Sequence, residues 1–253
     1  MPVRSELDGH VRVITLDRPE RHNALDDATS AQLEAALAAA YTDDSRVILL
    51  RGAGRSFCSG RDVAQLGHRA GGESDLDFVR GHQDRRLAMV ACPKPIVAAV
   101  RGYALGGGLE LALAADIRIA ATDAQLAFPE VRYGLMTDTG GSAFATVLAG
   151  PSRAKLLAMT GRRIDAAQSL AWGLVDEIVP PDELDQHALD LCHEIAAHSP
   201  SAVAMIKQVV DESWHATLHA TSRAELLAQV ALFASPEYLA AKAARSATTR
   251  RAE

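Results

Sequence analysis

A run of three glycines is the first place in the chain where backbone geometry points to chemistry. Gly106, Gly107 and Gly108 follow an apolar run that ends at Val100 and precede a segment expected to be helical from Leu109. Without Cβ atoms the backbone can approach a ligand closely, and the unpaired N–H groups at a helix start suit a developing negative charge. The spacing matches neither the phosphate loop nor GxGxxG. The segment therefore predicts a site that stabilises negative charge through backbone donors.

Glu110 places a carboxylate in the first turn of that helix. Residues 111–115 are apolar all round, so we expect the carboxylate to be largely buried. One interpretation is catalytic, since such a group can act as a general acid or base. The alternative is a carboxylate that caps the helix or interacts with its dipole. Burial raises a carboxyl pKa and a helix N-terminus lowers it, so the sequence leaves the direction of the net shift open.

A second glycine-containing turn, SFCSGRD (56–62), follows the apolar run at 47–51. Cys58 and Ser59 are candidate nucleophiles, but GxSxG is absent and no histidine is placed by the sequence to activate either. We favour a backbone role, in which a tight turn leaves the N–H groups near Ser59 and Gly60 free.

Composition excludes several classes of protein. The 253 residues suffice for one or two domains, and 48% are apolar and 23% charged, as is usual for a soluble chain. A net charge of -6 argues against nucleic acid as the main partner. The apolar runs are far shorter than the roughly 20 residues of a membrane-spanning helix, and residues 1–17 lack a secretory pattern. Three cysteines without a CxxC pair favour a reduced, cytoplasmic location.

The elements that must position these residues alternate between strand and helix, which favours α/β packing with a site in the loops after the strands. We expect strands at 11–16, 47–51, 96–100, 117–121, 126–128 and 175–179. We expect helices beginning at Asp26 or Asp27 and at 142, and others at 75–90, 152–160, 165–172 and 181–198. The glycine-rich segment 66–73 is predicted to be a mobile surface loop.

The last part of the chain is helical by periodicity. We expect helices at 200–214, 221–233 and 236–245, suited to packing on a neighbouring subunit. We therefore divide the chain into a catalytic core at 1–195 and a C-terminal helical oligomerisation region at 196–253.

The two glycine turns and a third segment together resemble a known family. They read FCSGRD (57–62), GYALGGGLE (102–110) and FPEVRYG (128–134), and they are similar in order and spacing to the signatures of the enoyl-CoA hydratase/isomerase (crotonase) superfamily. RPERHNAL (18–25), LAMTGRRID (157–165) and AWGLVD (171–176) agree, so the resemblance covers about residues 10–210. It implies an α/β fold, a spiral of ββα turns followed by a C-terminal helical trimerisation region, and a homotrimer or dimer of trimers.

The resemblance also implies a reaction. Members bind acyl-CoA thioesters and stabilise an enolate in an oxyanion hole of two backbone N–H groups, which by motif position belong to Ser59 and Gly107. The matching catalytic positions are Glu110, the base for the attacking water, and Glu130, which exchanges the α-carbon proton. We therefore expect an enoyl-CoA hydratase of lipid metabolism, which adds water reversibly and syn to a 2-enoyl-CoA. No metal or redox cofactor is implied, and coenzyme A is part of the substrate.

Contacts to the substrate are carried over from the same motifs. The expected residues are Arg21, Ala24, Gly60, Arg61, Asp62, Val63, Leu66, Gly106, Tyr133 and Asp138. Arg21 is the candidate for a CoA phosphate. Lys242 is not assigned, because the end of the chain departs from the family's usual pattern.

Some departures keep other functions open. Thr137 stands where the family often has proline, and Asp138 occupies a position that some isomerases and a dehalogenase use for chemistry. The alternative for Asp138 is a turn or helix cap before Gly140. A double-bond isomerase using Glu130 or Asp138 is the nearest rival function. A non-catalytic acyl-CoA-binding subunit is the rival from another class.

Overall fold

A computed structural model describes residues 1–66, 69 and 72–252. Its strands are β1 (Val3–Asp8), β2 (Val11–Leu16), β3 (Val47–Gly52), β4 (Ile96–Val100), β5 (Tyr103–Leu105), β6 (Ile117–Ala121), β7 (Gln125–Ala127), β8 (Ile164–Asp165) and β9 (Glu177–Val179). Its α-helices are α1 (Asp27–Thr42), α2 (Asp75–Val90), α3 (Gly107–Leu113), α4 (Gly141–Ala149), α5 (Pro151–Thr160), α6 (Ala166–Ala171), α7 (Leu184–Ala196), α8 (Pro200–Phe233) and α9 (Pro236–Ala252). Short 3-10 helices are η1 (Pro19–Arg21), η2 (Val63–Gln65) and η4 (Pro129–Tyr133).

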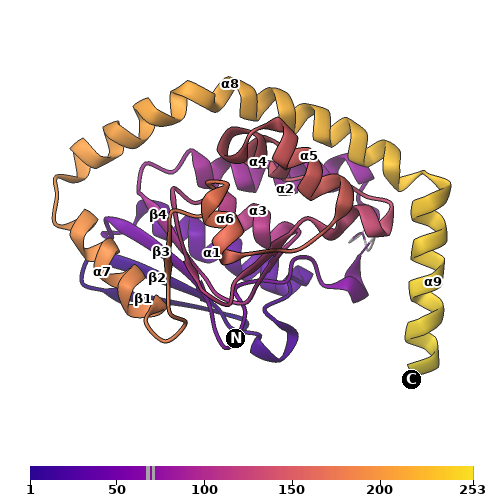
Figure 1. Cartoon of the computed structure of the whole chain (residues 1–253), viewed down its shortest axis with the longest axis horizontal. Helices are drawn as coiled ribbons and strands as arrows, with labels where there is room; N and C mark the ends of the chain where they lie inside the picture. Colours follow the sequence, from indigo (N-terminus) through magenta and orange to yellow (C-terminus); the bar gives the residue numbers. More distant parts are fainter. Residues whose placement is uncertain (67–68, 70–71, 253) are drawn as a thin grey trace.

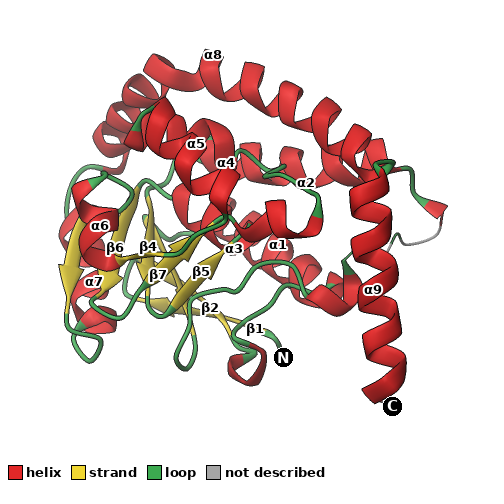
Figure 2. Ribbon diagram, turned by 45° about the vertical axis from the view of Figure 1, so that its right-hand side comes forward, coloured by secondary structure: helices red, strands yellow, loops and turns green. Residues whose placement is uncertain are grey.

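A six-stranded sheet forms the centre of the molecule, in the order β1-β2-β3-β4-β6-β9, and only β1 runs antiparallel to its neighbour. Alternate residues of its strands enter different cores, as the two-residue period of a strand requires. Ile48 and Leu50 pack with Leu33 and Leu37 of α1, whereas Val47 and Leu49 belong to the cluster that includes α7. Both faces of the parallel strands are therefore covered, which explains their continuous apolar sequences (Figure 2).

A three-stranded sheet, β5-β7-β8, lies beside the glycine turns. β5 leads directly into α3, and β7 leads into η4. Cys58 forms an isolated bridge with Ala104 of β5, which ties the first glycine turn to the second. Two segments far apart in the sequence are thereby brought to one place.

α8 is the feature that differs most from the sequence-based expectation. Two helices were expected, at 200–214 and 221–233, but one helix of 34 residues runs through both. The intervening HATLHA (215–220) contains neither glycine nor proline, so nothing ends the helix, and Leu218 is buried within the main core. Figure 1 shows α8 arching over α2 and α4 before the chain turns into α9.

Some of the other predicted strands and helices are confirmed, and some observed elements were not predicted. The strands at 11–16, 47–51, 96–100 and 117–121 and the helix at 75–90 are confirmed, and Asp26 caps α1 by accepting the N–H of Thr29 over 2.7 Å. β1, β5 and β8 were not expected, because β1 is a largely exposed edge strand and the other two have only three and two residues. The predicted loop at 66–73 falls partly on residues 67–68 and 70–71, which lie outside the described residues.

The three cysteines are free and buried in different places. Cys192 lies on α7 with the cluster on one side of the sheet, whereas Cys58 and Cys92 belong to the main core. Among the described residues, no helix is both long and apolar enough to cross a membrane.

Candidate functional site

A cavity of about 600 Å³ collects the residues proposed from the sequence. Its walls come from the segment between β2 and α1, the turn leading into η2, the turn between β5 and α3, η4 with the residues after it, and the last turns of α8. Its lining includes Arg21, Ala24, Ser59, Gly60, Arg61, Asp62, Val63, Leu66, Gly106, Gly107, Glu110, Glu130, Tyr133 and Asp138. All the candidate site residues are therefore neighbours of one cavity.

Close contact between the two glycine turns depends on positions that a side chain would disrupt. Gly60 has φ +88°, and a Cβ there would lie 2.5 Å from the Leu105 carbonyl oxygen and 3.4 Å from the Gly107 nitrogen. Gly106 has φ +54°, and a Cβ there would lie 2.6 Å from Glu130 Oε1. L side chains rarely adopt this left-handed region. The two glycines thus let the turns meet and let Glu130 reach the start of α3.

Gly107 and Ser59 present their N–H groups differently. In the described part of the chain the Gly107 N–H has no backbone acceptor, as expected for the first residue of a helix. The Ser59 N–H donates to the His22 carbonyl oxygen over 3.0 Å, and the Gly60 N–H lies 3.4 Å from Cys58 Sγ. The Ser59 N–H, which was expected to be free, is therefore engaged, and the Gly60 N–H faces the Cys58 thiol, whereas the Gly107 N–H is open.

The nucleophile interpretation of this turn is not supported. Cys58 is fully buried, and burial raises the pKa of its thiol to about 12, which disfavours the reactive thiolate. The hydroxyl of Ser59 donates to the Arg21 carbonyl oxygen over 3.4 Å rather than to a base.

Glu110 is buried, with 2% of its surface exposed, and it is held by a helix other than its own. Its Oε1 accepts the N–H groups of Thr139 over 2.9 Å and Gly141 over 3.0 Å, at the start of α4. Gly106, the residue before α3, receives no side-chain cap. The alternative of Glu110 capping its own helix is therefore wrong.

Glu130 lies on η4, across the turn from Gly106. Its Oε2 is buried without a hydrogen-bond partner on another described residue. Burial, and then the negative charge of Glu110, raise the pKa of Glu130 well above its ordinary value. Glu130 is therefore a carboxyl group suited to carrying a proton.

Asp138 is half-buried in the cavity wall and caps no helix. The cap residue of α4 is Gly140, which has no side chain, and the N–H groups at the start of α4 donate to Glu110 and Glu225. Asp138 Oδ2 instead accepts the Nε2–H of Gln229 over 3.1 Å. Burial and Glu110 raise the pKa of Asp138 well above its ordinary value. The cap alternative is therefore wrong, and Asp138 is a third carboxyl group of the site.

Glu225 of α8 is a fourth carboxyl group, which sequence reasoning missed. It is 1% exposed, and it accepts the N–H groups of Gly140 and Ser142, each over 2.8 Å, with the Thr137 hydroxyl at 3.0 Å. Burial and Glu110 raise its pKa to about 7. Its spacing of four from Gln229 on one helix face was the available signal. The sequence predicts that this helix serves oligomerisation, so Glu225 and Gln229 were not predicted to belong to the site.

One end of the cavity is bounded by α2 and the end of α8. The Arg69 guanidinium lies 3.8 Å from the centre of the Phe78 ring and 4.5 Å from that of Phe233. Burial and neighbouring arginines lower the pKa of His82 to about 3, so its ring is neutral near pH 7. Arg86 completes this wall and attracts the Glu110 carboxylate. None of these side chains was predicted individually from the sequence.

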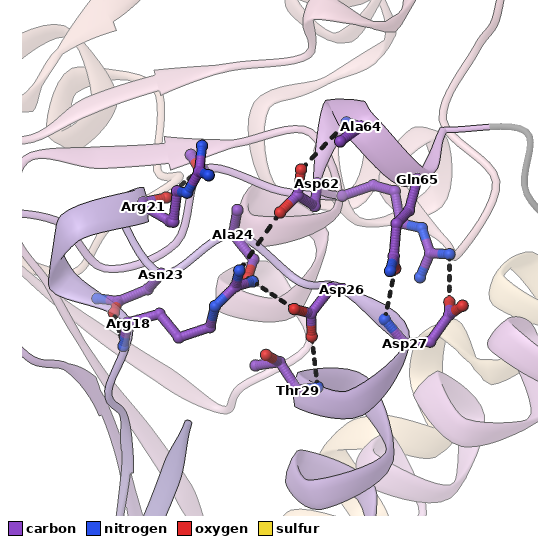
Figure 3. A network of polar contacts seen from close by, with 12 residues as sticks. Arg18, Arg21, Asn23, Ala24, Asp26, Asp27, Thr29, Asp62, Ala64 and Gln65 are labelled. Atoms are coloured by element: carbon purple, nitrogen blue, oxygen red, sulfur yellow. Dashed lines mark hydrogen bonds and ion pairs between the residues drawn. The ribbon is translucent and has the colours of Figure 1, made fainter. Parts of the chain in front are cut away.

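A polar network braces the mouth of the cavity (Figure 3). Arg18 donates to the Ala24 carbonyl oxygen over 2.7 Å and pairs with Asp26 at 3.0 Å and Asp62 at 3.5 Å. Asp62 also accepts the Ala64 N–H over 3.1 Å and so begins η2. Asp62 therefore joins the segment that carries Arg18 to the start of η2 at the rim of the cavity.

Two arginines at the rim behave differently. Arg61 pairs with Asp27 and lies 5.8 Å from the centre of the Phe78 ring, so its charge is already matched. Arg21 is exposed and stands apart from the Arg18 network, and no salt bridge of its side chain is found among the described residues (Figure 3). Arg21 is the better placed of the two to meet an anionic group of a ligand.

Comparison with known proteins agrees with this geometry. The family model of enoyl-CoA hydratase/isomerase matches residues 6–243. The chain is 37% identical to a probable enoyl-CoA hydratase of Rhizobium meliloti over 237 residues, which cover 92% of this chain and 90% of that one. It is 40% identical to a carnitinyl-CoA dehydratase of Salmonella arizonae over 211 residues, covering 82% and 79%.

A solved structure matches over the whole chain. It is an enoyl-CoA hydratase/isomerase from Xanthobacter autotrophicus Py2, with a TM-score of 0.90, 32% identity, and coverage of 100% of this chain and 96% of that one. The two mixed sheets and long C-terminal helices are thus those of the crotonase fold. The chain belongs to the enoyl-CoA hydratase/isomerase (crotonase) superfamily.

Proposed function

We propose that the protein is an enoyl-CoA hydratase, which adds water reversibly and syn across the 2,3-double bond of an enoyl-CoA. The observation that carries the proposal is the placement of Glu110 and Glu130 in one cavity, beside the open N–H of Gly107. Relatives named enoyl-CoA hydratase and carnitinyl-CoA dehydratase support this class of chemistry, and the acyl group remains to be identified.

The two carboxyl groups divide the proton transfers. Ionised Glu110 takes a proton from water as the water oxygen bonds to C3, and the double-bond electrons move to form an enolate of the thioester. Protonated Glu130 then gives its proton to C2, which restores the carbonyl. After one turnover Glu110 carries a proton and Glu130 is ionised, so a proton passes between them or through solvent before the next.

Backbone donors stabilise the enolate oxygen in this proposal. The Gly107 N–H takes one hydrogen bond, and the Ser59 N–H supplies the second by sharing or releasing the His22 carbonyl oxygen. A donor fixed at a developing oxyanion is typically worth about 3–4 kcal/mol. The exposed guanidinium of Arg21 would meet a phosphate of coenzyme A.

The test is the hydration of crotonyl-CoA and of longer 2-enoyl-CoA thioesters. The reaction is measured as the loss of the absorbance of the conjugated thioester. We expect wild-type turnover and a loss of about 10³-fold in kcat for Glu110→Gln. Glu212→Gln, which removes an exposed carboxylate from α8, is the matched control. Thioester binding without turnover at every chain length would instead identify a non-catalytic acyl-CoA-binding subunit.

A double-bond isomerase is the second candidate, favoured by Asp138. Its carboxyl group faces the same cavity, and its raised pKa allows it to carry a proton. A 3-enoyl-CoA incubated in H₂¹⁸O separates the two functions, because isomerisation moves a proton and incorporates no oxygen. Isomerisation that is lost in Asp138→Asn and proceeds without hydration would replace the hydratase assignment.

A homotrimer, alone or as a dimer of trimers, is the proposed assembly, and residues 196–253 are the proposed oligomerisation region beside a catalytic core at 1–195. Support comes from the first half of α8, where Met205, Ile206, Val209 and Val210 are all more than half exposed. Such an apolar stripe indicates a contact surface. Light scattering should show the oligomer and its loss in Ile206→Asp with Val209→Asp.

A further inference from the structure

α8 brings a line of buried polar side chains against the segment that precedes α4. Ser222, Glu225 and Gln229 are each less than 5% exposed and lie three and four residues apart, on one face of the helix. Gln229 Oε1 accepts the N–H of Met136, and its Nε2 donates to Asp138 Oδ2. The helix therefore holds the segment that precedes α4 through side chains rather than by apolar packing alone.

The start of α4 is divided between two carboxylates. The N–H groups of Thr139 and Gly141 donate to Glu110 Oε1, over 2.9 and 3.0 Å. Those of Gly140 and Ser142 donate to Glu225, each over 2.8 Å. Four successive main-chain donors therefore alternate between the two carboxylates, at the positively polarised end of the helix.

This arrangement leaves little room for one carboxylate to move without the other. Gly140 has φ +101°, and a Cβ at Gly141 would lie 2.8 Å from Glu110 Oε1. Thr137 and Ser142 share a hydroxyl hydrogen bond of 2.7 Å, and the Thr137 hydroxyl also contacts Glu225 at 3.0 Å. A displacement of the turn at its Glu225 side therefore displaces the N–H groups that orient Glu110.

We propose that Glu225 is a positioning residue that fixes the turn at 137–142, and through it the orientation of Glu110. The inference rests on the proposed function in one respect, that Glu110 acts as the base. Glu225 itself need not touch the substrate. It acts through the main-chain N–H groups that it shares with Glu110.

Electrostatics supports this role from every side of Glu225. Glu110 from α3 repels a negative charge there, and Glu130 from η4 and Asp138 from the turn interact with Glu225 in the same sense. α4 offers N–H and hydroxyl donors, while α2 offers neutral His82 and the Arg86 guanidinium that attracts Glu110. Glu225, whose pKa is about 7, is largely protonated in mildly acidic solution and then adds no negative charge beside Glu110.

Kinetics tests the effect on Glu110. In Glu225→Gln we expect kcat for crotonyl-CoA to fall by about 10- to 100-fold, with KM within about twofold, because the base is misplaced while the binding walls remain. The step near pH 7 in the wild-type profile of kcat against pH should vanish. Glu212→Gln on the exposed face of α8 should match wild type. A Glu225→Gln enzyme with wild-type kcat and pH profile would overturn the inference.

Amide hydrogen exchange tests the same inference without relying on activity. Glu225→Gln removes an acceptor from Gly140 and Ser142, so faster exchange at these two amides is expected from contact alone. The inference requires faster exchange at Thr139 and Gly141 as well, whose acceptor is Glu110. Unchanged exchange at Thr139 and Gly141 overturns it, even if the protein proves not to be a hydratase.

Discussion

On one side of the cavity, Ser59, Gly60, Gly106 and Gly107 present main-chain atoms from two short turns; we call this the backbone wall. The carboxyl groups of Glu110, Glu130 and Asp138 also line the cavity, and Glu225 is bonded to the turn that follows Asp138; we call these four groups the carboxylate wall. The first wall consists of local sequence, whereas the second is assembled from α3, η4, the turn before α4, and α8. A donor set for an oxyanion can thus be encoded in two motifs, but the ionisation of the acids depends on long-range contacts.

The largest expected effect on activity comes from removing the proposed proton donor of the carboxylate wall, Glu130. Glu130→Gln removes the group that exchanges the α-proton, so hydration should fall by about 10³-fold. Exchange of the α-proton of butyryl-CoA in D₂O should fall equally, whereas Glu110→Gln should retain more of it. NMR of the thioester measures both, and equal exchange in the two variants would contradict the division of roles.

Disturbing the contact between Gly106 of the backbone wall and Glu130 of the carboxylate wall should have the next largest effect on activity. Gly106→Ala puts a Cβ at φ +54° and 2.6 Å from Glu130 Oε1, so we expect kcat to fall by about 10²-fold and stability by about 1–3 kcal/mol. Gly150→Ala is the matched control, because Gly150 has φ +83° but nothing within 4 Å of an added Cβ. Urea denaturation and steady-state kinetics should separate backbone strain, present in both variants, from damage to the site.

The pH dependence of stability sharpens the picture of the carboxylate wall. Folding raises the pKa of Glu225 from 4.5 to about 7, so its contribution to stability is complete below pH 4.5 and is lost as pH rises through 7. The unfolding free energy of wild type minus that of Glu225→Gln should therefore fall by about 1–3 kcal/mol between pH 5 and pH 8. His82 titrates in both proteins and cancels. A difference that stays constant would refute the raised pKa.

The smallest expected effect lies at the rim. Arg21→Gln should raise KM for crotonyl-CoA by about fivefold, which is the scale of one exposed ion pair, and leave kcat unchanged. The effect should diminish at high salt. Crotonyl-pantetheine, which lacks the nucleotide phosphates, should show no change between the two enzymes. An equal loss with both thioesters would assign Arg21 to the shape of the rim instead.

The backbone wall could be predicted largely because each of its two turns is a short stretch of consecutive residues. The glycines at 106–108 and in the turn at 56–62 indicate that the backbone approaches a ligand closely. The periodicity of apolar residues predicted the central strands and α2. The engagement of the Ser59 N–H could not be predicted, since its acceptor, His22, comes from a different segment. Glu225 was missed for the same reason: its partners at 137–142 lie far away in sequence, and its spacing of four from Gln229 was the only local signal.

The three buried thiols make the layers of this fold separately observable. Cys58 lies beneath the glycine turns, Cys92 follows α2, and Cys192 lies on α7 across the sheet. None can react with an external reagent until its own layer opens. The order in which the three become modified during slow labelling would therefore show whether the site loosens before the sheet does, with no probe added to the chain.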